Sequence, residues 1–181
     1  MPRGDDTSKD PDKPTLPDYQ FGAPDPREGK ALYDLTVNTG NLDVNSPYAY
    51  ALWCRDFAAT SIVARKGDDL AGSITGYLRP DDPRTLFVWQ VAVSPAHRRQ
   101  GLARRMLDNL VDRLRPEGVD WVETTVTPDN KASLRLFASF AEGRNVKIKQ
   151  DVLFTEQDLG PGHEPEVLHT IGPLPYRETQ K

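Results

Sequence analysis

Hydrophobic positions along the chain form two kinds of run, one with helical spacing and one typical of strands. Apolar residues recur every three or four positions in segments that predict helices at residues 28–39, 47–59, 102–115 and 129–142. Apolar and β-branched runs predict strands at residues 61–65, 70–78, 85–93, 119–126, 146–154 and 166–171. We therefore expect an α/β (α+β) domain in which helices flank one mixed sheet.

Turn and connection signals indicate how the strands are joined. The Gly-Asp-Asp sequence at residues 67–69 predicts a hairpin between the two strands around it. The helix that follows Gly101 leads from strand 85–93 to strand 119–126. A crossover of this type joins parallel strands with right-handed chirality, so the sheet is expected to be mixed.

The segment LFVWQVAVSPAHRRQGLARRM, residues 86–106, contains the first candidate binding site. Ser94 and Pro95 end its strand, and a short loop then enters the next helix at Gly101. The first N–H groups of a helix lack intrahelical partners and the helix dipole adds positive charge there, so this loop suits a pyrophosphate. The alternative is a basic surface turn that only caps the helix.

Composition and charge narrow the classes of partner. The 181-residue chain has a net charge of -4, which argues against general nucleic-acid binding. The basic patch HRRQGLARR, residues 97–105, suits a small anion better than a polymer, and nucleic-acid binding through it is kept as an alternative. No apolar segment predicts a membrane span.

The cysteine and histidine content predicts neither a disulfide nor a metal site. Cys54 is the only cysteine, so no intrachain disulfide can form, and a reduced, cytoplasmic protein is expected. Its apolar neighbours predict a buried, unreactive thiol. The three histidines lie far apart in the sequence and have no metal-ligand spacing.

Composition also divides the chain into three parts. Residues 1–17, rich in Pro, Asp and Lys, are expected to form a disordered extension. Residues 18–174 are expected to form the folded domain, and residues 175–181 a flexible tail.

Two motifs resemble those of the GCN5-related N-acetyltransferases (GNAT). RRQGLA at residues 98–103 is similar to the family's acetyl-CoA signature Q/R-x-x-G-x-G/A, and PDNKASLRLF at residues 128–137 is similar to its N-x-x-A-x-x-L-Y helix. The resemblance implies the GNAT fold: a twisted, mostly antiparallel sheet of six to seven strands, flanked by about four helices and splayed around a CoA cleft. It implies acetyl-CoA as co-substrate, bound by Val91, Val93, Arg98, Arg99, Gln100, Gly101, Leu102, Ala103 and Asn130.

The sequence departs from the family pattern at Phe137. The family motif usually has a tyrosine there, which protonates the departing thiolate. Phenylalanine has no hydroxyl group, so the general acid has to be another group. Tyr48, Tyr50 and water are the alternatives.

Further segments resemble the branch of this family that acetylates the 4-amino group of L-2,4-diaminobutyrate in ectoine biosynthesis. They are LDVNSPYAY at residues 42–50, TLFVWQVAV at 85–93, ETTVTPDNKAS at 123–133 and the pair His163-Glu164. The resemblance implies a small diamino acid as acceptor, direct transfer in a ternary complex, and a homodimer. It places the following residues near the substrate: Asp43, Asn45, Tyr48, Trp89, Thr125, His163 and Glu164.

The chemistry of amide formation indicates which residues act on the amine. An alkylammonium with a pKa near ~10.4 has to lose a proton before it attacks a thioester, so the site needs a proton acceptor. Glu123 lies in an apolar strand, where a carboxylate is costly unless it is paired or functional. Glu123 is therefore the first candidate for the base, His163 is the second, and Tyr48 is the candidate for the acid.

Each candidate also has a structural explanation. Glu123 is consistent with a solvated edge position and Trp89 with a core position. Asp43 and Asn45 are consistent with capping of the helix after them or with turn formation. Tyr48 is consistent with a half-buried packing residue, and His163 with an exposed loop. For the whole chain, the alternatives are acetylation of another small amine, such as a polyamine or an aminoglycoside, and a non-catalytic acyl-CoA-binding module.

Overall fold

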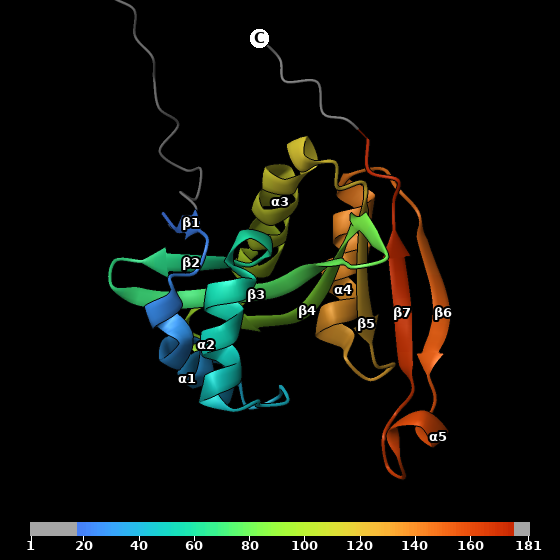
Figure 1. Cartoon of the computed structure of the whole chain (residues 1–181), viewed down its shortest axis with the longest axis horizontal. Helices are drawn as coiled ribbons and strands as arrows, with labels where there is room; N and C mark the ends of the chain where they lie inside the picture. Colours follow the sequence, from blue (N-terminus) through green and yellow to red (C-terminus); the bar gives the residue numbers. More distant parts are fainter. Residues whose placement is uncertain (1–17, 176–181) are drawn as a thin grey trace, which may run out of the picture.

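The computed structural model describes residues 18–175 and contains a seven-stranded sheet (Figure 1). The strands are ordered β1-β2-β3-β4-β5-β7-β6, and only β4 and β5 pair in parallel. The extension expected at residues 1–17 and nearly all of the tail expected at 175–181 lie outside the described residues. The strand bounds are β1 Gln20–Gly22, β2 Ile62–Lys66, β3 Asp69–Arg79, β4 Asp82–Val93, β5 Trp121–Val126, β6 Ile148–Phe154 and β7 Glu166–Ile171.

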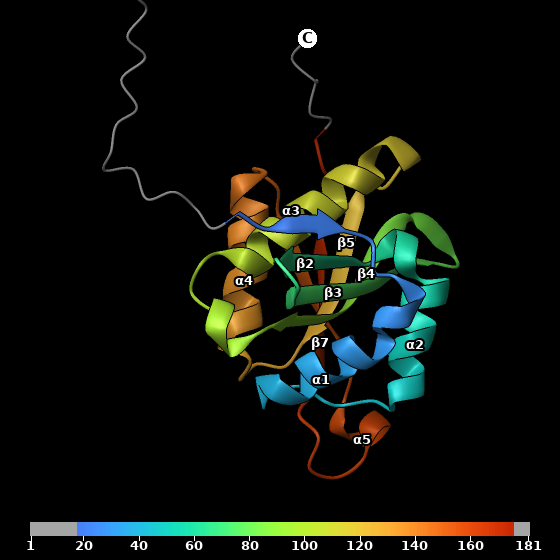
Figure 2. The same ribbon diagram turned by 90° about the vertical axis from the view of Figure 1, so that its left-hand side faces the viewer.

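Helices cover both faces of the sheet (Figures 1 and 2). One face carries α1, Gly29–Thr39, and α2, Pro47–Asp56, and the other carries α3, Leu102–Leu114, and α4, Lys131–Gly143. A short helix, α5, spans Glu156–Leu159 between β6 and β7. Single 3₁₀ turns lie at Pro26–Glu28, Ala58–Thr60, Pro95–His97 and Arg115–Glu117. Within residues 18–175, no helix has both the length and the apolar character needed to cross a bilayer.

The amphipathic pattern of α3 explains its position against the sheet. Its apolar positions recur every three or four residues and all six of them are buried: Leu102, Met106, Leu107, Leu110, Val111 and Leu114. They form the larger core with residues from β2 to β5 and α4. This packing holds the beginning of α3 beside the end of β4.

The sheet splays between β4 and β5. The two strands pair only from Thr85↔Trp121 to Phe87↔Glu123, after which they diverge. Figure 1 shows β2, β3 and β4 running crosswise to β5, β7 and β6. The splay that the family resemblance implied is thus present, and it leaves the β5-facing edge of β4 open from Val88 onward.

A β-bulge lies in β4 next to this splay. Thr75 and Gly76 of β3 are paired with Gln90 and Val88, so Trp89 is the extra residue on β4. Such a bulge bends the strand and redirects a side chain. Trp89 is 53% exposed, which shows that the core explanation for this tryptophan is wrong.

The observed elements confirm most of the predicted ones. Strand β7 has the predicted bounds, and α2 begins at Pro47, where the Ser46 hydroxyl accepts from the Ala49 N–H at 3.2 Å. Helix α2 ends at Asp56 rather than at residue 59 because a separate 3₁₀ turn follows. Strand β1 and helix α5 were not predicted, since three- and four-residue elements carry too little periodicity.

Candidate active site

Two adjacent cavities open where β4 and β5 diverge. The sheet cavity, of about 850 Å³, lies between β3 to β5 and the β6–α5–β7 segment. The loop cavity, of about 660 Å³, lies between the loop at residues 95–101, the first turn of α3, and α4. Both are lined by Asn41, Leu42, Val91, Asn130 and Ser133, so they meet at the splay.

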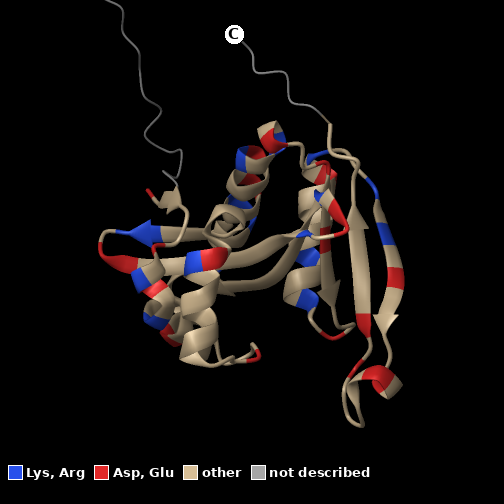
Figure 3. Ribbon diagram, in the orientation of Figure 1, with Lys and Arg blue, Asp and Glu red and all other residues tan. Residues whose placement is uncertain are grey.

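The loop cavity has the geometry of an anion site. Arg99 and Gly101 both adopt left-handed backbone conformations, with φ of 62° and 67°, as in loops whose amides converge on an anion. Gly101 is the N-cap of α3 and makes no side-chain cap, so the first amides of this 13-residue helix are available to a ligand. Figure 3 shows further basic residues along α3 and in the lower half of α4.

Eight of the nine residues predicted to bind the cofactor line the loop cavity: Val91, Val93, Arg98, Arg99, Gly101, Leu102, Ala103 and Asn130. Arg98 is held there because its Nη2 donates to the Thr39 carbonyl at 2.8 Å. Gln100 does not line the cavity. Its side chain accepts from the Tyr19 hydroxyl at 2.8 Å, which turns it away toward the N-terminal segment.

Tyr19 connects the N-terminal segment to this loop. Its hydroxyl lies 2.9 Å from His97 Nδ1, and its ring lies under the Arg105 guanidinium at 5.4 Å. His97 lines the loop cavity, although its sequence context gave it no role. The Tyr19-Gln20-Phe21 sequence, two aromatics after a Pro- and Asp-rich segment, is the signal that identifies this contact.

Substitution of Tyr19 with phenylalanine is expected to raise KM for acetyl-CoA about 2- to 10-fold, because one hydrogen bond to the loop is worth about 0.5–1.5 kcal/mol. The ring and its packing are retained, so KM for the amine should not change. Steady-state kinetics measures both constants. Tyr33→Phe on α1, which removes a hydroxyl outside both cavity linings, is the matched control. Equal effects of the two variants on KM for acetyl-CoA would contradict the assignment.

Glu123 is the most buried carboxylate of the sheet cavity, with 8% of its surface exposed. Its Oε2 accepts from Arg79 Nη1 at 2.9 Å and its Oε1 accepts from Thr170 Oγ1 at 3.2 Å. The solvated edge explanation is wrong, because β5 lies between β4 and β7. Arg79, which also pairs with Asp81 at 2.8 Å, was missed by sequence reasoning. The LRPDD sequence at the end of β3 contains the signal.

Five of the residues expected near the substrate line the sheet cavity: Asp43, Asn45, Trp89, Thr125 and His163. The capping explanation for the first two is wrong, because Ser46 caps α2. Trp89 stands beside the Trp53 ring, with centroids 5.9 Å apart. These side chains bring acidic, amide, aromatic and imidazole groups to one cavity.

Two expected residues do not line either cavity. Tyr48 lies in the first turn of α2 and is 72% exposed, because the buried side of that helix is formed by Tyr50 and Cys54. Glu164 is exposed and lies in neither cavity lining, although its neighbour His163 does line the sheet cavity. The structure therefore does not bring the Tyr48 hydroxyl to the reacting groups.

Gln90 is a further cavity residue that the sequence analysis missed. Its Oε1 accepts from the Tyr50 hydroxyl at 3.2 Å, and its Nε2 donates to the Asp43 carbonyl at 2.9 Å. It thus connects buried Tyr50 to the loop that carries Asp43. Phe137 is buried and lines the sheet cavity, so the ring without a hydroxyl is at the cavity itself.

The sulfur and metal chemistry of the described chain is simple. Cys54 is fully buried, and desolvation raises the pKa of its thiol to about 11, as expected for an unreactive cysteine. Within residues 18–175, no cluster of three or more His, Cys, Asp and Glu side chains has the arrangement of a metal site.

His169, buried on β7 with Gln150 Nε2 3.2 Å from its Nδ1, makes stability depend on pH. Burial lowers the pKa of this imidazole below its ordinary value. The unfolded chain therefore binds the proton more readily, and the stabilising contribution, present above about pH 6.5, is lost as the pH falls through the folded-state pKa. The free energy of unfolding, measured with urea, should therefore be lower at pH 5.0 than at pH 7.5. This difference between the two pH values should be smaller in His169→Asn. An unchanged difference in the variant would contradict the role of His169.

The arrangement of these two cavities around a splayed sheet agrees with the similarity of the chain to known proteins. The model of the Acetyltransferase (GNAT) family matches residues 30–141, which include α3 and most of α4 beside the loop cavity. The chain belongs to the GNAT acetyltransferase family. The expected fold and the expected class of enzyme, an acyltransferase, are thereby confirmed.

Within this family, the chain is similar to enzymes of one specificity. It is 51% identical over 160 residues to the L-2,4-diaminobutyric acid acetyltransferase of Streptomyces coelicolor, covering 87% of this chain and 94% of that protein. It is 41% identical over 156 residues to the protein of the same name from Halalkalibacterium halodurans, covering 85% and 82%. The solved diaminobutyrate acetyltransferase of Paenibacillus lautus, in complex with L-2,4-diaminobutyric acid and coenzyme A, has a TM-score of 0.83 and 39% identity over 89% of this chain and 98% of that one.

Proposed function

We propose that this chain transfers the acetyl group of acetyl-CoA to the 4-amino group of L-2,4-diaminobutyrate and forms N4-acetyl-diaminobutyrate for ectoine biosynthesis, an osmoprotectant pathway. The observation that carries the proposal is the junction of the two cavities at Val91 and Asn130. An anion-binding loop lies on one side of this junction, and acidic and aromatic side chains lie on the other. The 51% identity to the Streptomyces coelicolor enzyme supports the same acceptor.

The loop cavity binds acetyl-CoA in this proposal. The amides of residues 99–103 hold the pyrophosphate at the beginning of α3. The pantetheine arm lies along the edge of β4 that β5 leaves after Phe87. A backbone N–H near Val91 or Val93 donates to the thioester oxygen, which becomes negative during the attack.

The sheet cavity binds the diamino acid. The Asp43 carboxylate attracts the ammonium groups by its negative charge, and the Trp89 ring attracts them through a cation–π contact. Arg79 supplies positive charge for the substrate carboxylate. Asn45 and Thr125 supply further hydrogen-bonding groups, and Glu164 follows the cavity residue His163 in the chain.

The reaction is a direct transfer in a ternary complex. Glu123 accepts a proton from the 4-ammonium group through a water, and His163 is the second candidate for this role. The neutral nitrogen attacks the carbonyl carbon and the C–N bond forms. The C–S bond then breaks, and the nitrogen releases its second proton to solvent to give the amide. The CoA thiolate takes its proton from solvent, because Phe137 has no hydroxyl and Tyr48 lies outside both cavity linings.

The test is an assay of CoA release with a panel of amines: diaminobutyrate, diaminopropionate, ornithine, lysine and spermidine. We expect the highest kcat/KM with diaminobutyrate and acetylation at N4 by mass spectrometry and NMR. Activity confined to spermidine would replace the acceptor but leave the acetyltransferase reaction intact. Tight binding of acetyl-CoA without turnover of any amine would support the non-catalytic module instead.

We also propose a cytoplasmic homodimer. Exposed apolar side chains cluster on β6 and α5: Val152, Leu153, Phe154 and Leu159. We place the interface on β6, because β6 is at the edge of the sheet whereas β7, the last strand of the chain, lies inside it. An exposed apolar edge strand is suited to pairing with a second copy. Light scattering should give about twice the 20.2 kDa chain mass, and a mass of one chain at micromolar concentration would contradict the dimer.

A further inference from the structure

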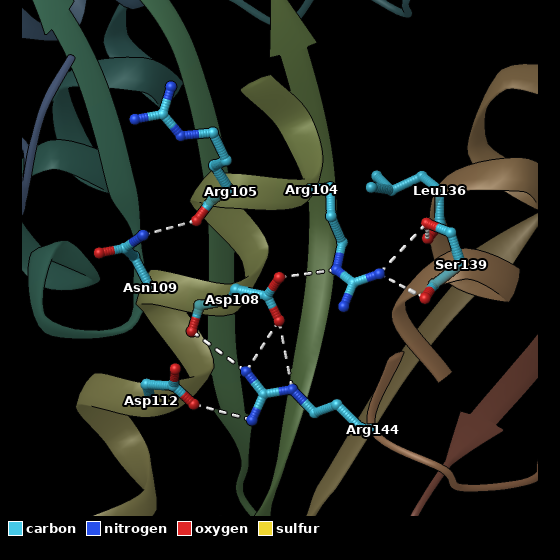
Figure 4. A network of polar contacts seen from close by, with 8 residues as sticks. All are labelled: Arg104, Arg105, Asp108, Asn109, Asp112, Leu136, Ser139 and Arg144. Carbon is cyan, nitrogen blue, oxygen red and sulfur yellow. Dashed lines mark hydrogen bonds and ion pairs between the residues drawn. The ribbon is translucent and has the colours of Figure 1, made fainter. Parts of the chain in front are cut away.

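We propose that Arg144, at the end of α4, is a positioning residue for cofactor binding, which acts through Asp108 and Arg104 on the wall of the loop cavity. This inference rests on the proposed binding of acetyl-CoA. Figure 4 shows the three side chains in a row between α3 and α4, with Ser139 at the far end. Arg104 and Ser139 line the loop cavity, whereas Arg144 and Asp108 lie behind it.

Arg144 is a buried cation held in one position. Its side chain is 2% exposed, and its Nη2 donates to Asp108 Oδ1 at 2.9 Å. Its Nη1 pairs with Asp112 Oδ1 at 2.7 Å. A buried guanidinium is costly unless such partners satisfy it, and several directional contacts fix the side chain more firmly than one would.

Asp108 transmits this position to Arg104. Its second oxygen, Oδ2, accepts from Arg104 Nε at 2.7 Å, so one carboxylate joins the two guanidinium groups. Arg104 Nη1 in turn donates to the carbonyl of Ser139 on α4. The chain of contacts therefore crosses from α4 to α3 and returns to α4 at the cavity wall.

Two packing features restrict the position of the Arg104 guanidinium. The Phe140 ring, which is fully buried, contacts both guanidinium groups, with its centroid 5.5 Å from Arg104 Cζ and 5.0 Å from Arg144 Cζ. Gly143 provides the space for the end of Arg104, because a Cβ atom at residue 143 would clash with Arg104 Nη2. Arg104 is thus packed against the α4 backbone, and the distance between the two helices beside the cavity depends on it.

The same contacts would also serve a purely stabilising link between α3 and α4, and Gly143→Ala separates the two roles. Alanine is the better helix former, and residue 143 is the last residue of α4, so the variant should keep the thermal midpoint of the wild type. The added methyl group displaces the Arg104 guanidinium, the far end of a flexible side chain. We expect KM for acetyl-CoA to rise at least 5-fold, with kcat and KM for the amine within 2-fold of wild type.

A second variant tests whether Arg144, at the buried end of this series of contacts, affects the binding of acetyl-CoA. Arg144→Lys keeps the charge but loses the planar fork that reaches both aspartates, so KM for acetyl-CoA should rise in the same way. Asn109→Ala is the matched control, because Asn109 is an exposed residue of α3 that donates only to the Arg105 carbonyl in Figure 4. It should leave KM for acetyl-CoA unchanged.

Calorimetric titration with CoA distinguishes failure of this inference from failure of the proposed function. One outcome is that CoA binds to the wild type, and that Gly143→Ala and Arg144→Lys keep both the wild-type affinity for CoA and the wild-type KM for acetyl-CoA. This outcome would overturn the positioning role alone. Loss of thermal stability in Arg144→Lys with unchanged KM would assign the contacts to folding only and would overturn it too. Absence of CoA binding to the wild type would overturn both proposals.

Discussion

Replacement of Glu123 with glutamine is expected to lower kcat by about 100- to 10,000-fold, the usual contribution of a positioned general base. Glutamine has the same shape and still accepts from Thr170, but it cannot take a proton from the amine. Arg79 keeps Asp81 as a partner, so the free energy of unfolding should fall by no more than about 2 kcal/mol. The pH dependence of kcat should also differ from that of the wild type, because the proton of the amine then has to go to another acceptor.

Two further variants make this experiment decisive. Glu117→Gln, an exposed residue in the turn after α3, should behave as the wild type. Thr170→Val removes one hydrogen bond to Glu123 and leaves the Glu123 carboxylate in place. The kcat of this variant should therefore lie between those of the wild type and Glu123→Gln. A Glu123→Gln enzyme with a wild-type pH–rate profile would transfer the role of base to His163.

The second large effect is expected for Gly101→Ala, which should raise KM for acetyl-CoA at least ~10-fold, about 1.4 kcal/mol. The φ of 67° is unfavourable for alanine, and an added Cβ would point into open space at the loop cavity, where the pyrophosphate is proposed to bind. The substitution leaves Glu123 and the sheet cavity untouched. At saturating acetyl-CoA, kcat should therefore stay within about 3-fold of wild type.

Gly118→Ala is the control for the backbone strain in that experiment. Gly118 has a φ of 97° and open space around it, but it lies at the other end of α3 and lines neither cavity. Both variants should lose about 1–2 kcal/mol of stability, and only Gly101→Ala should lose affinity for acetyl-CoA. If both raise KM equally, the effect belongs to the stability of α3 and not to the anion site.

The fold was largely predictable because its longer elements have strong periodicity. Helix α3 shows this most clearly: the spacing of its apolar residues placed one face in the core, and all six buried positions were predicted. The parallel pairing of β4 and β5 followed from the α3 crossover. The extra strand β1 was missed because its three residues are held by pairing with a distant part of the chain, from Gln20↔Arg65 to Gly22↔Val63 of β2.

The site was predictable only where a local motif defines it. The cofactor loop depends on neighbouring residues, and eight of its nine predicted members line one cavity. The sheet cavity combines residues from seven helices and strands and from the loops between them, so single positions were harder to place. Tyr48 and Tyr50 are two residues apart, and the helix turns the first to solvent and the second to the core. Arg79 and Gln90 were missed because their partners, Glu123 and Tyr50, are distant in sequence.

The bulge at Trp89 divides β4 into two independently adjustable segments. Residues before it pair with β5 beside Glu123, and residues after it lead into the cofactor loop. Because the extra residue absorbs the change of register, the side chain at position 89 can be exchanged without turning the cofactor segment to its other face. We therefore expect point substitutions of Trp89 to change the preference for the acceptor, whereas deletion of that residue should shift the register and disturb both cavities.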